Sequence, residues 1–177
     1  MSAATPGKSQ WCVGIAAAAF AGAMTMASPG HAGEWASDGK SGCKVWNPNP
    51  QLEETVAWSG ACPKGFAEGT GTAQWRRGVV VIETDEGIWR DGRQIGLGVQ
   101  KWAGGRYEGD LADGEPNGRG VMTLKLQRYE GEFRAGRPNG AGSLTADGKV
   151  VQGNWRDGCL EGGEQKVSVG IPLSACR

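Results

Sequence analysis

Two nearly identical lines decide the fold: "YEGDLADGEPNGRG" at residues 107–120 and "YEGEFRAGRPNGAG" at residues 129–142. Aligned on their first glycine, they belong to a longer series. Each unit of this series starts at one glycine, which we call its lead glycine; the five are Gly60, Gly87, Gly109, Gly131 and Gly153. The first two are 27 residues apart, and each later one follows 22 residues after the one before it. The first four units repeat glycine at offsets 5, 9 and 11, whereas the fifth has Glu164 at the last of these positions. A period in the twenties predicts a repeat architecture.

The local pattern predicts one β-hairpin per unit. Around each lead glycine, one set of alternate residues is mostly apolar, as in Tyr107 and Leu111, and the other is mostly polar, as in Glu108 and Asp110. Such alternation is typical of a strand with one apolar and one solvated face. "RDG", "ADG" and "RAG" supply turns, and a second strand follows each Gly-x-Gly. We therefore expect an all-β protein with about ten strands in one elongated, twisted antiparallel sheet, roughly 45 Å long.

The lead glycines fall on the apolar face of the expected strands. A neighbouring aromatic ring can lie across such bare backbone, so each unit is expected to provide a socket for its neighbour's ring. With no helix or second sheet evident to cover this face, its aromatic side chains would form an exposed strip. We expect partner binding or self-association there, through Trp89, Trp102, Tyr107, Tyr129, Phe133 and Trp155.

The repeated lines resemble the MORN (membrane occupation and recognition nexus) repeat, with its Tyr-x-Gly, an aromatic residue two positions on, and spaced glycines ending in Gly-x-Gly. The resemblance covers about residues 56–163 and is closest in units three and four. It is looser where Trp58, Asp85 and Val151 replace the tyrosine. It implies stacked hairpins that act as a scaffold for protein or lipid contacts, and it implies no catalysis.

The flanks depart from the repeat. "CKVWNPNPQLEETVAWSGAC" is interpreted as a hairpin with a strand to Trp46, an Asn-Pro-Asn-Pro turn and a strand from Glu53 into Trp58. The C-terminal segment contains "KVSVGI", which we expect to be a strand. Repeat arrays need closed ends, so we expect an N-terminal cap at 33–55, about five MORN units at 56–158 and a C-terminal cap at 159–177. Disulfides Cys43–Cys62 and Cys159–Cys176 are expected to lock the two caps, although four cysteines permit three pairings.

The first 32 residues are expected to be a secretory signal. A single cation, Lys8, precedes a short alanine-rich apolar run, and small residues follow at the spacing that a signal peptidase recognises. Cleavage is expected after Ala32, or alternatively after Ala27, and the other interpretation is an uncleaved membrane anchor. The mature protein would be periplasmic or secreted. Without Cys12 it would keep four of the five cysteines, and an even number in an exported chain indicates disulfides.

Composition argues against several function classes. The only histidine, His31, lies in the segment expected to be removed, which would leave no imidazole for triads or zinc sites. The chain has 19 basic and 19 acidic residues, and this balance gives no electrostatic case for nucleic acid or an anionic membrane. The Gly-x-Gly motifs lack the strand-to-helix context of a nucleotide loop. No pair of carboxylates stands out for glycoside hydrolysis, and we expect no cofactor and no metal.

The acidic residues of the polar face leave one alternative open, because Glu86, Glu108, Asp110, Glu130 and Glu132 would form a stripe. Such a stripe suits a solvated face, or else calcium or a cationic partner. The preferred hypothesis is a non-catalytic exported scaffold for protein–protein interaction. A phospholipid- or envelope-associated module is the alternative, and a carbohydrate-binding protein comes third.

Overall fold

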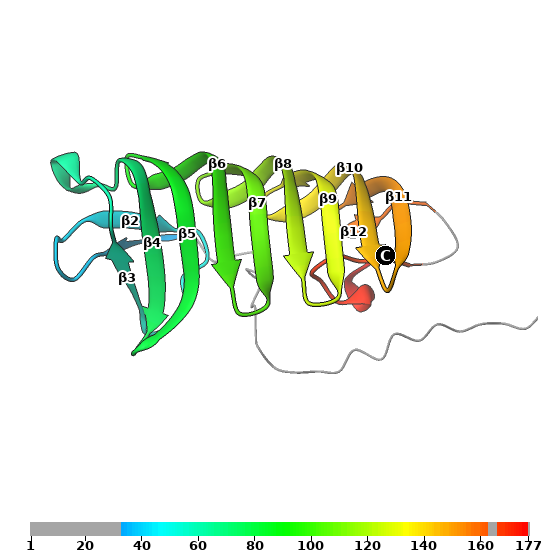
Figure 1. Ribbon diagram of the computed structural model, residues 1–177, viewed down its shortest axis with the longest axis horizontal. Coiled ribbons are helices and arrows are strands. Elements are labelled where there is room, and N and C mark those ends of the chain that lie inside the picture. The colour runs from blue at the N-terminus through cyan, green and yellow to red at the C-terminus, as the bar shows by residue number, and fades with distance from the viewer. Residues whose placement is uncertain (1–32, 163–165, 177) are drawn as a thin grey trace, which may run out of the picture.

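The computed structural model describes residues 33–162 and 166–176, so the expected signal segment lies outside the described residues. One ten-stranded antiparallel sheet runs from β3 to β12, with every strand paired to its neighbours in sequence (Figure 1). Its strands are β3 (Glu54–Trp58), β4 (Gly69–Arg77), β5 (Val80–Arg90), β6 (Arg93–Trp102), β7 (Gly105–Ala112), β8 (Glu115–Leu124), β9 (Gln127–Arg134), β10 (Arg137–Ala146), β11 (Lys149–Arg156) and β12 (Cys159–Leu160). The expected meander of hairpins is confirmed.

The lead glycines pair with the last glycine of each Gly-x-Gly, so that one row of glycines crosses eight strands. The row consists of Gly71, Gly87, Gly98, Gly109, Gly120, Gly131, Gly142 and Gly153. The tight Gly-x-Gly segments, expected to precede the second strands, therefore lie inside them. The strands are longer than the sequence pattern indicated.

The sheet bends beside this glycine row. Gly109 pairs with Gly120, but Leu111 pairs with Pro116, so β8 carries two extra residues on its side of the hairpin. Gly118 lies in this stretch with a φ of +119°, which a residue with a side chain rarely adopts. The β5–β6 and β9–β10 pairs change register in the same way. The strands consequently fold over at the upper edge in Figure 1.

Hydrogen bonds between successive turns hold the folded-over part together. The backbone N–H groups of Gly114, Gly136 and Gly158 donate to the carbonyl oxygens of Gln94, Pro116 and Pro138, at 3.0, 3.0 and 2.9 Å. Each bond joins the turn of one hairpin to the second strand of the preceding hairpin; the acceptors lie in β6, β8 and β10. Successive units therefore stack on one another beyond their strand pairing.

The N-terminal cap differs from the expected hairpin. β2 (Lys44–Asn47) pairs with a strand that the sequence analysis did not predict, β1 (Glu34–Ser37), and not with β3 across the Asn-Pro-Asn-Pro segment. β3 instead pairs with β4 as the first strand of the main sheet. The β1–β2 hairpin packs on the β5–β6 turn, where Trp46 N–H donates to the Gly92 carbonyl at 2.8 Å.

At the other end, the expected strand in "KVSVGI" is wrong. In the described residues of this segment, a single β-bridge joins Ser168 to Cys159, and Leu160 N–H donates to the Val167 carbonyl at 3.0 Å. A short 3₁₀ turn follows at Leu173–Ala175, and another, at Pro63–Gly65, follows β3. The disulfides Cys43–Cys62 and Cys159–Cys176 are both formed, so the expected pairing is confirmed.

Candidate functional site

The aromatic residues expected to bind a partner lie mostly in the core. Tyr107 and Tyr129 have no exposed surface, and Trp89, Phe133 and Trp155 expose 3% or less; Trp102 is half-buried. The expectation of an exposed aromatic strip is therefore wrong for five of the six residues. Their contact with a partner stays an untested prediction, and their burial does not favour it.

The bend explains this burial. Tyr107 precedes the bend in β7 and Phe133 follows it two strands away in β9, so a flat sheet would hold them roughly 16 Å apart. Their ring centroids lie 5.0 Å apart in an edge-to-face contact. Phe133 also meets Tyr129 at 5.2 Å, and Tyr129 meets Trp155 at 5.2 Å. The two arms of the folded sheet thus enclose a continuous layer of rings without any helix.

The glycine row makes room for these rings. A Cβ atom added at Gly120 would lie 2.6 Å from Tyr107 Cζ, and one at Gly109 would lie 2.7 Å from Tyr107 Oη. Tyr129 lies in the same way over Gly131 and Gly142, and Trp58 over Gly60 and Gly71. Each ring therefore covers the glycines of its own unit. The expected sockets exist, but the expectation that a neighbour's ring fills them is wrong.

The tyrosine hydroxyls are fixed by backbone carbonyls. Tyr107 Oη donates to the Asp110 carbonyl at 2.7 Å, and Tyr129 Oη donates to the Glu132 carbonyl at 3.3 Å. Burial raises the pKa of Tyr107 above its ordinary value, and it raises the pKa of Tyr129 to about 12. Both hydroxyls are thus neutral hydrogen-bond donors whose role here is structural.

Unit two has a different interior. Asp85 stands where units three and four have tyrosine, and it is joined by the buried Gln94 and Gln100. Gln100 Nε2 donates to Gln94 Oε1 at 3.2 Å and to the Gly114 carbonyl at 2.8 Å. This polar layer divides the apolar core into two clusters, one containing Val56, Trp75 and Trp89 and the other containing Tyr107, Tyr129 and Trp155.

The carboxyl groups of Asp85, in this layer, and of nearby Glu83 have pKa values above their ordinary values. Burial raises the pKa of Asp85 to about 7, although the Trp75 indole, which donates to Asp85 Oδ2 at 2.7 Å, favours the charged form. Burial and the nearby charge of Asp85 raise the pKa of Glu83 well above its usual value. The charge on either carboxyl group opposes ionisation of the other, so ionising both at once is disfavoured in this buried site.

The outer face of the sheet carries a row that includes three acidic residues of the expected stripe, for which the sequence analysis offered a solvated face or else calcium or a cationic partner. Three acidic side chains alternate with small ones along consecutive cross-strand partners, and Gln152 takes the place of a fourth acid at the end; the eight residues are Thr72, Glu86, Val99, Glu108, Val121, Glu130, Ser143 and Gln152. All of these side chains are exposed or half-buried. This row, which we call the outer row, crosses eight strands on the face of the sheet that is presented to solvent.

Cations flank the acidic members of the outer row. Lys101 lies 2.7 Å from Glu86, Arg106 lies 2.7 Å from Glu108, and Arg128 lies 2.8 Å from Glu130. Among the residues that the structure describes, no group of three or more metal-ligating side chains is arranged to hold an ion. Three of the five acidic residues of the expected stripe, Glu86, Glu108 and Glu130, therefore form surface ion pairs, each of which contributes little to stability.

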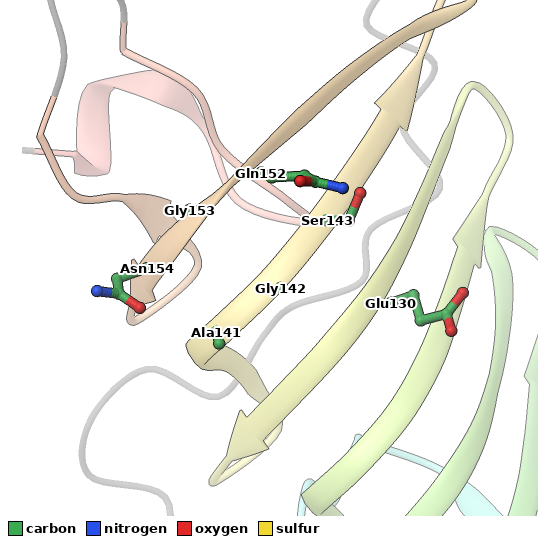
Figure 2. A pocket seen from close by; sticks show the side chains of 7 residues that line it. All are labelled: Glu130, Ala141, Gly142, Ser143, Gln152, Gly153 and Asn154. Carbon is green, nitrogen blue, oxygen red and sulfur yellow. The ribbon is translucent and has the colours of Figure 1, made fainter.

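A shallow hollow occupies the C-terminal end of the outer row. Figure 2 shows Ser143 and Gln152 beside the bare backbone of Gly142 and Gly153, with Glu130 on the far side. Ala141 and Asn154 complete the lining. The glycine row therefore also shapes the outer surface, because it leaves a depression that side chains do not fill.

The MORN repeat family matches the chain at residues 86–105, 107–125 and 129–150. These segments are MORN repeats. They begin close to the lead glycines of units two, three and four, whereas units one and five lie outside the matches. A search of curated proteins found no match to the chain. MORN repeats are modules for protein or membrane interaction, and the two disulfides indicate an oxidising environment.

Two further observations bear on localisation. The described residues include no helix long and apolar enough to cross a membrane. The expected signal segment and its cleavage site at Ala27 or Ala32 fall on residues that the structure does not describe, so both stay predictions.

Proposed function

We propose that this protein is an exported, non-catalytic scaffold that binds a protein partner through the outer row of its sheet. The observation that supports this proposal is the burial of the aromatic face inside the bent sheet. Burial leaves the outer face as the long, regular surface available for contact. The MORN repeats supply the precedent for an interaction module.

The proposal also covers the ends of the array. Residues 33–55 and 159–177 act as caps for about five units at 56–158, two more than the matched repeats. A scaffold of this kind works outside the cytoplasm, in the periplasm or after secretion, once the signal segment is removed. The caps prevent end-to-end pairing of the sheet, which would otherwise compete with partner binding.

The outer row suits an elongated partner. Its acidic members recur on every second strand, at intervals of about 9.6 Å. A partner with cationic groups at this interval can pair with Glu86, Glu108 and Glu130, and its cations then replace the protein's own cations at these carboxylates. The hollow beside Ser143 and Gln152 accepts a protruding side chain.

The test compares two double variants in co-precipitation from the envelope and secreted fractions. Glu108→Lys with Glu130→Lys reverses two charges of the outer row and should abolish capture of partners while the melting temperature changes little. Tyr107→Ser with Tyr129→Ser removes core rings and should unfold the protein. Unchanged capture by a folded Glu108→Lys, Glu130→Lys protein would show that the outer row is not the binding surface.

A further inference from the structure

One tryptophan in the N-terminal cap is exposed. Trp35, in β1, exposes 42% of its surface, whereas every other aromatic side chain among the described residues is buried or half-buried. Its ring centroid lies 5.2 Å from that of Trp46, on the paired strand β2, and 5.2 Å from that of Phe66. The ring also lies against Gly92 of the β5–β6 turn, where an added Cβ atom would stand 2.6 Å from Trp35 Cζ3. Trp35 is therefore both exposed and held in place.

Two cations lie on these rings. The Arg93 guanidinium carbon lies 4.1 Å from the ring centroid of Trp46 and 5.3 Å from that of Trp35. The Lys44 ammonium nitrogen lies 5.5 Å from the ring centroid of Phe66. Cation–π contacts of this kind further fix the rings. We call these five residues the cap cluster, and Figure 1 shows the β1–β2 hairpin that carries three of them, in blue, at the N-terminal end of the array.

The surroundings of the cap cluster carry both signs of charge. Arg93 Nη1 lies 3.4 Å from Asp113 Oδ1, in a partly exposed ion pair. Four acidic residues and three basic residues belong to the cluster, contact it, or lie within two positions of one of its members in the sequence; they are Glu34, Glu68, Asp91 and Asp113, and Lys44, Lys64 and Arg93. A strongly charged ligand of either sign would meet like charges here. Hydroxyl groups suit both signs, because they accept from ammonium and guanidinium groups and donate to carboxylates.

We propose that the cap cluster binds a neutral saccharide, with a pyranose ring stacked on the exposed part of Trp35. A β-linked sugar of the glucose configuration carries its hydroxyl groups around the ring edge, so its faces consist of C–H groups that can pack on an indole. The hydroxyl groups at the edge can accept from Lys44 and Arg93 and donate to Asp113. Because its contacts already fix Trp35, little side-chain freedom is lost on binding.

This site is independent of the proposed protein binding. No residue of the cap cluster belongs to the outer row, and the β1–β2 hairpin forms a sheet separate from the ten-stranded one. Four of the five cluster residues also lie outside the matched MORN repeats, which include only Arg93. Carbohydrate binding, the third hypothesis from the sequence, thus gains a location in the cap and not in the repeats. Either contact can be lost without the other.

The test titrates the oxidised protein, expressed from the full chain, with cellotriose and with chitotriose. Binding is followed by the indole N–H peaks in heteronuclear NMR spectra, where the Trp35 peak is assigned from its loss in Trp35→Phe. The peaks of Trp35 and Trp46 should shift, and that of Trp155, buried at the other end of the array, should not. Sorbitol, an open-chain polyol with hydroxyl groups but no rigid ring face, should leave all of these peaks unchanged at the same concentration.

Two matched pairs of variants test the contacts. Trp35→Ala removes the stacking surface and should weaken binding of the trisaccharides at least about tenfold. Leu97→Ala removes another exposed apolar side chain, in β6, and should leave the affinity unchanged. Lys44→Met keeps every ring but removes one hydrogen-bond donor, and should weaken binding about threefold. Lys149→Met makes the same change at the exposed start of β11 and should have no effect.

The proposal is overturned if neither trisaccharide shifts the Trp35 peak, if sorbitol shifts it equally, or if Trp35→Ala and Leu97→Ala bind alike. Trp35→Ala also removes ring contacts within the cap, so displaced backbone peaks at Cys43 and Val45 would reveal a loosened cap. In that case the lysine pair decides, because Lys44 is exposed and its replacement leaves the rings in place. Equal affinities of Lys44→Met and Lys149→Met would then overturn the proposal.

Discussion

At the scale of single residues, glycine is the sensitive type. Gly109→Val places a branched side chain against the backbone of Gly120 and within reach of Tyr107 Oη. We expect a loss of about 3 kcal/mol in the free energy of unfolding, measured by urea denaturation. Glu108→Ala, one position away on the outer face, should change it by less than about 0.5 kcal/mol because its ion pair with Arg106 is exposed. Equal losses of unfolding free energy in the two variants would contradict the placement of Gly109 on the inner face and Glu108 on the outer face.

Asp85 gives the protein an unusual dependence on pH. Its pKa is raised to about 7 in the folded state, above the ordinary value of 3.8. Between these values the folded protein holds a proton that the unfolded chain has released, so stability falls as pH rises through about 7. Glu83 shifts in the same direction. The melting temperature should be higher at pH 5 than at pH 8.

Asp85→Asn tests this assignment. Its amide oxygen can still accept from the Trp75 indole, and no charge develops at this position at high pH. The variant should be the more stable protein at pH 8, with a flatter dependence of melting temperature on pH. A wild-type curve that rises from pH 5 to pH 8 would contradict the raised pKa values.

The residue pattern predicted which side chains share a face of the sheet, but it did not predict that the bent sheet would enclose the aromatic face. Burial of Tyr107, Met122, Tyr129 and Leu144 follows the sequence periodicity. Enclosure depends on the positive φ of Gly118 and Gly140 and on two extra residues in the second strand. Glycine at offset 9 was the available signal: it recurs in all five units without being needed for a hairpin turn, and the sequence analysis gave it no separate role.

At the scale of elements, the disulfides hold the two ends of the array. Cys43, immediately before β2, ties the small β1–β2 sheet to the segment after β3, and Cys176 ties the C-terminal segment to β12. Their loops, with separations of 19 and 17 residues, each contribute roughly 3 kcal/mol by the chain-entropy model. Replacing either pair with serine should lower the urea midpoint and speed amide exchange at that end first. Uniform loss of protection would contradict a local role.

The cap elements show where local sequence is insufficient. The Asn-Pro-Asn-Pro segment was assigned to a tight turn between neighbouring strands, yet the strands it separates belong to different sheets. Asn47 and Gln51 instead bring their side-chain N–H and backbone N–H to Glu54, at 3.0 and 2.9 Å. The N-terminal cap instead packs on the β5–β6 turn, a contact between residues far apart in the sequence that no local periodicity indicates. Within the array, repetition made every partner predictable.

At the scale of the whole molecule, the two apolar clusters should open separately. The polar layer of Asp85, Gln94 and Gln100 contributes little apolar burial between them, and repeat proteins couple only through neighbouring units. Raising the pH ionises this layer and weakens the joint. Hydrogen exchange at pH 8 should therefore show β3–β5 opening at a lower free energy than β8–β10, and the two opening free energies should converge at pH 5.

Asp85→Asn should make the two opening free energies similar at both pH values, because the polar layer then carries no titrating charge at this position. A single opening free energy across β3–β10 at pH 8 would mean that the stacked turn hydrogen bonds, which run through both clusters, dominate over the polar layer.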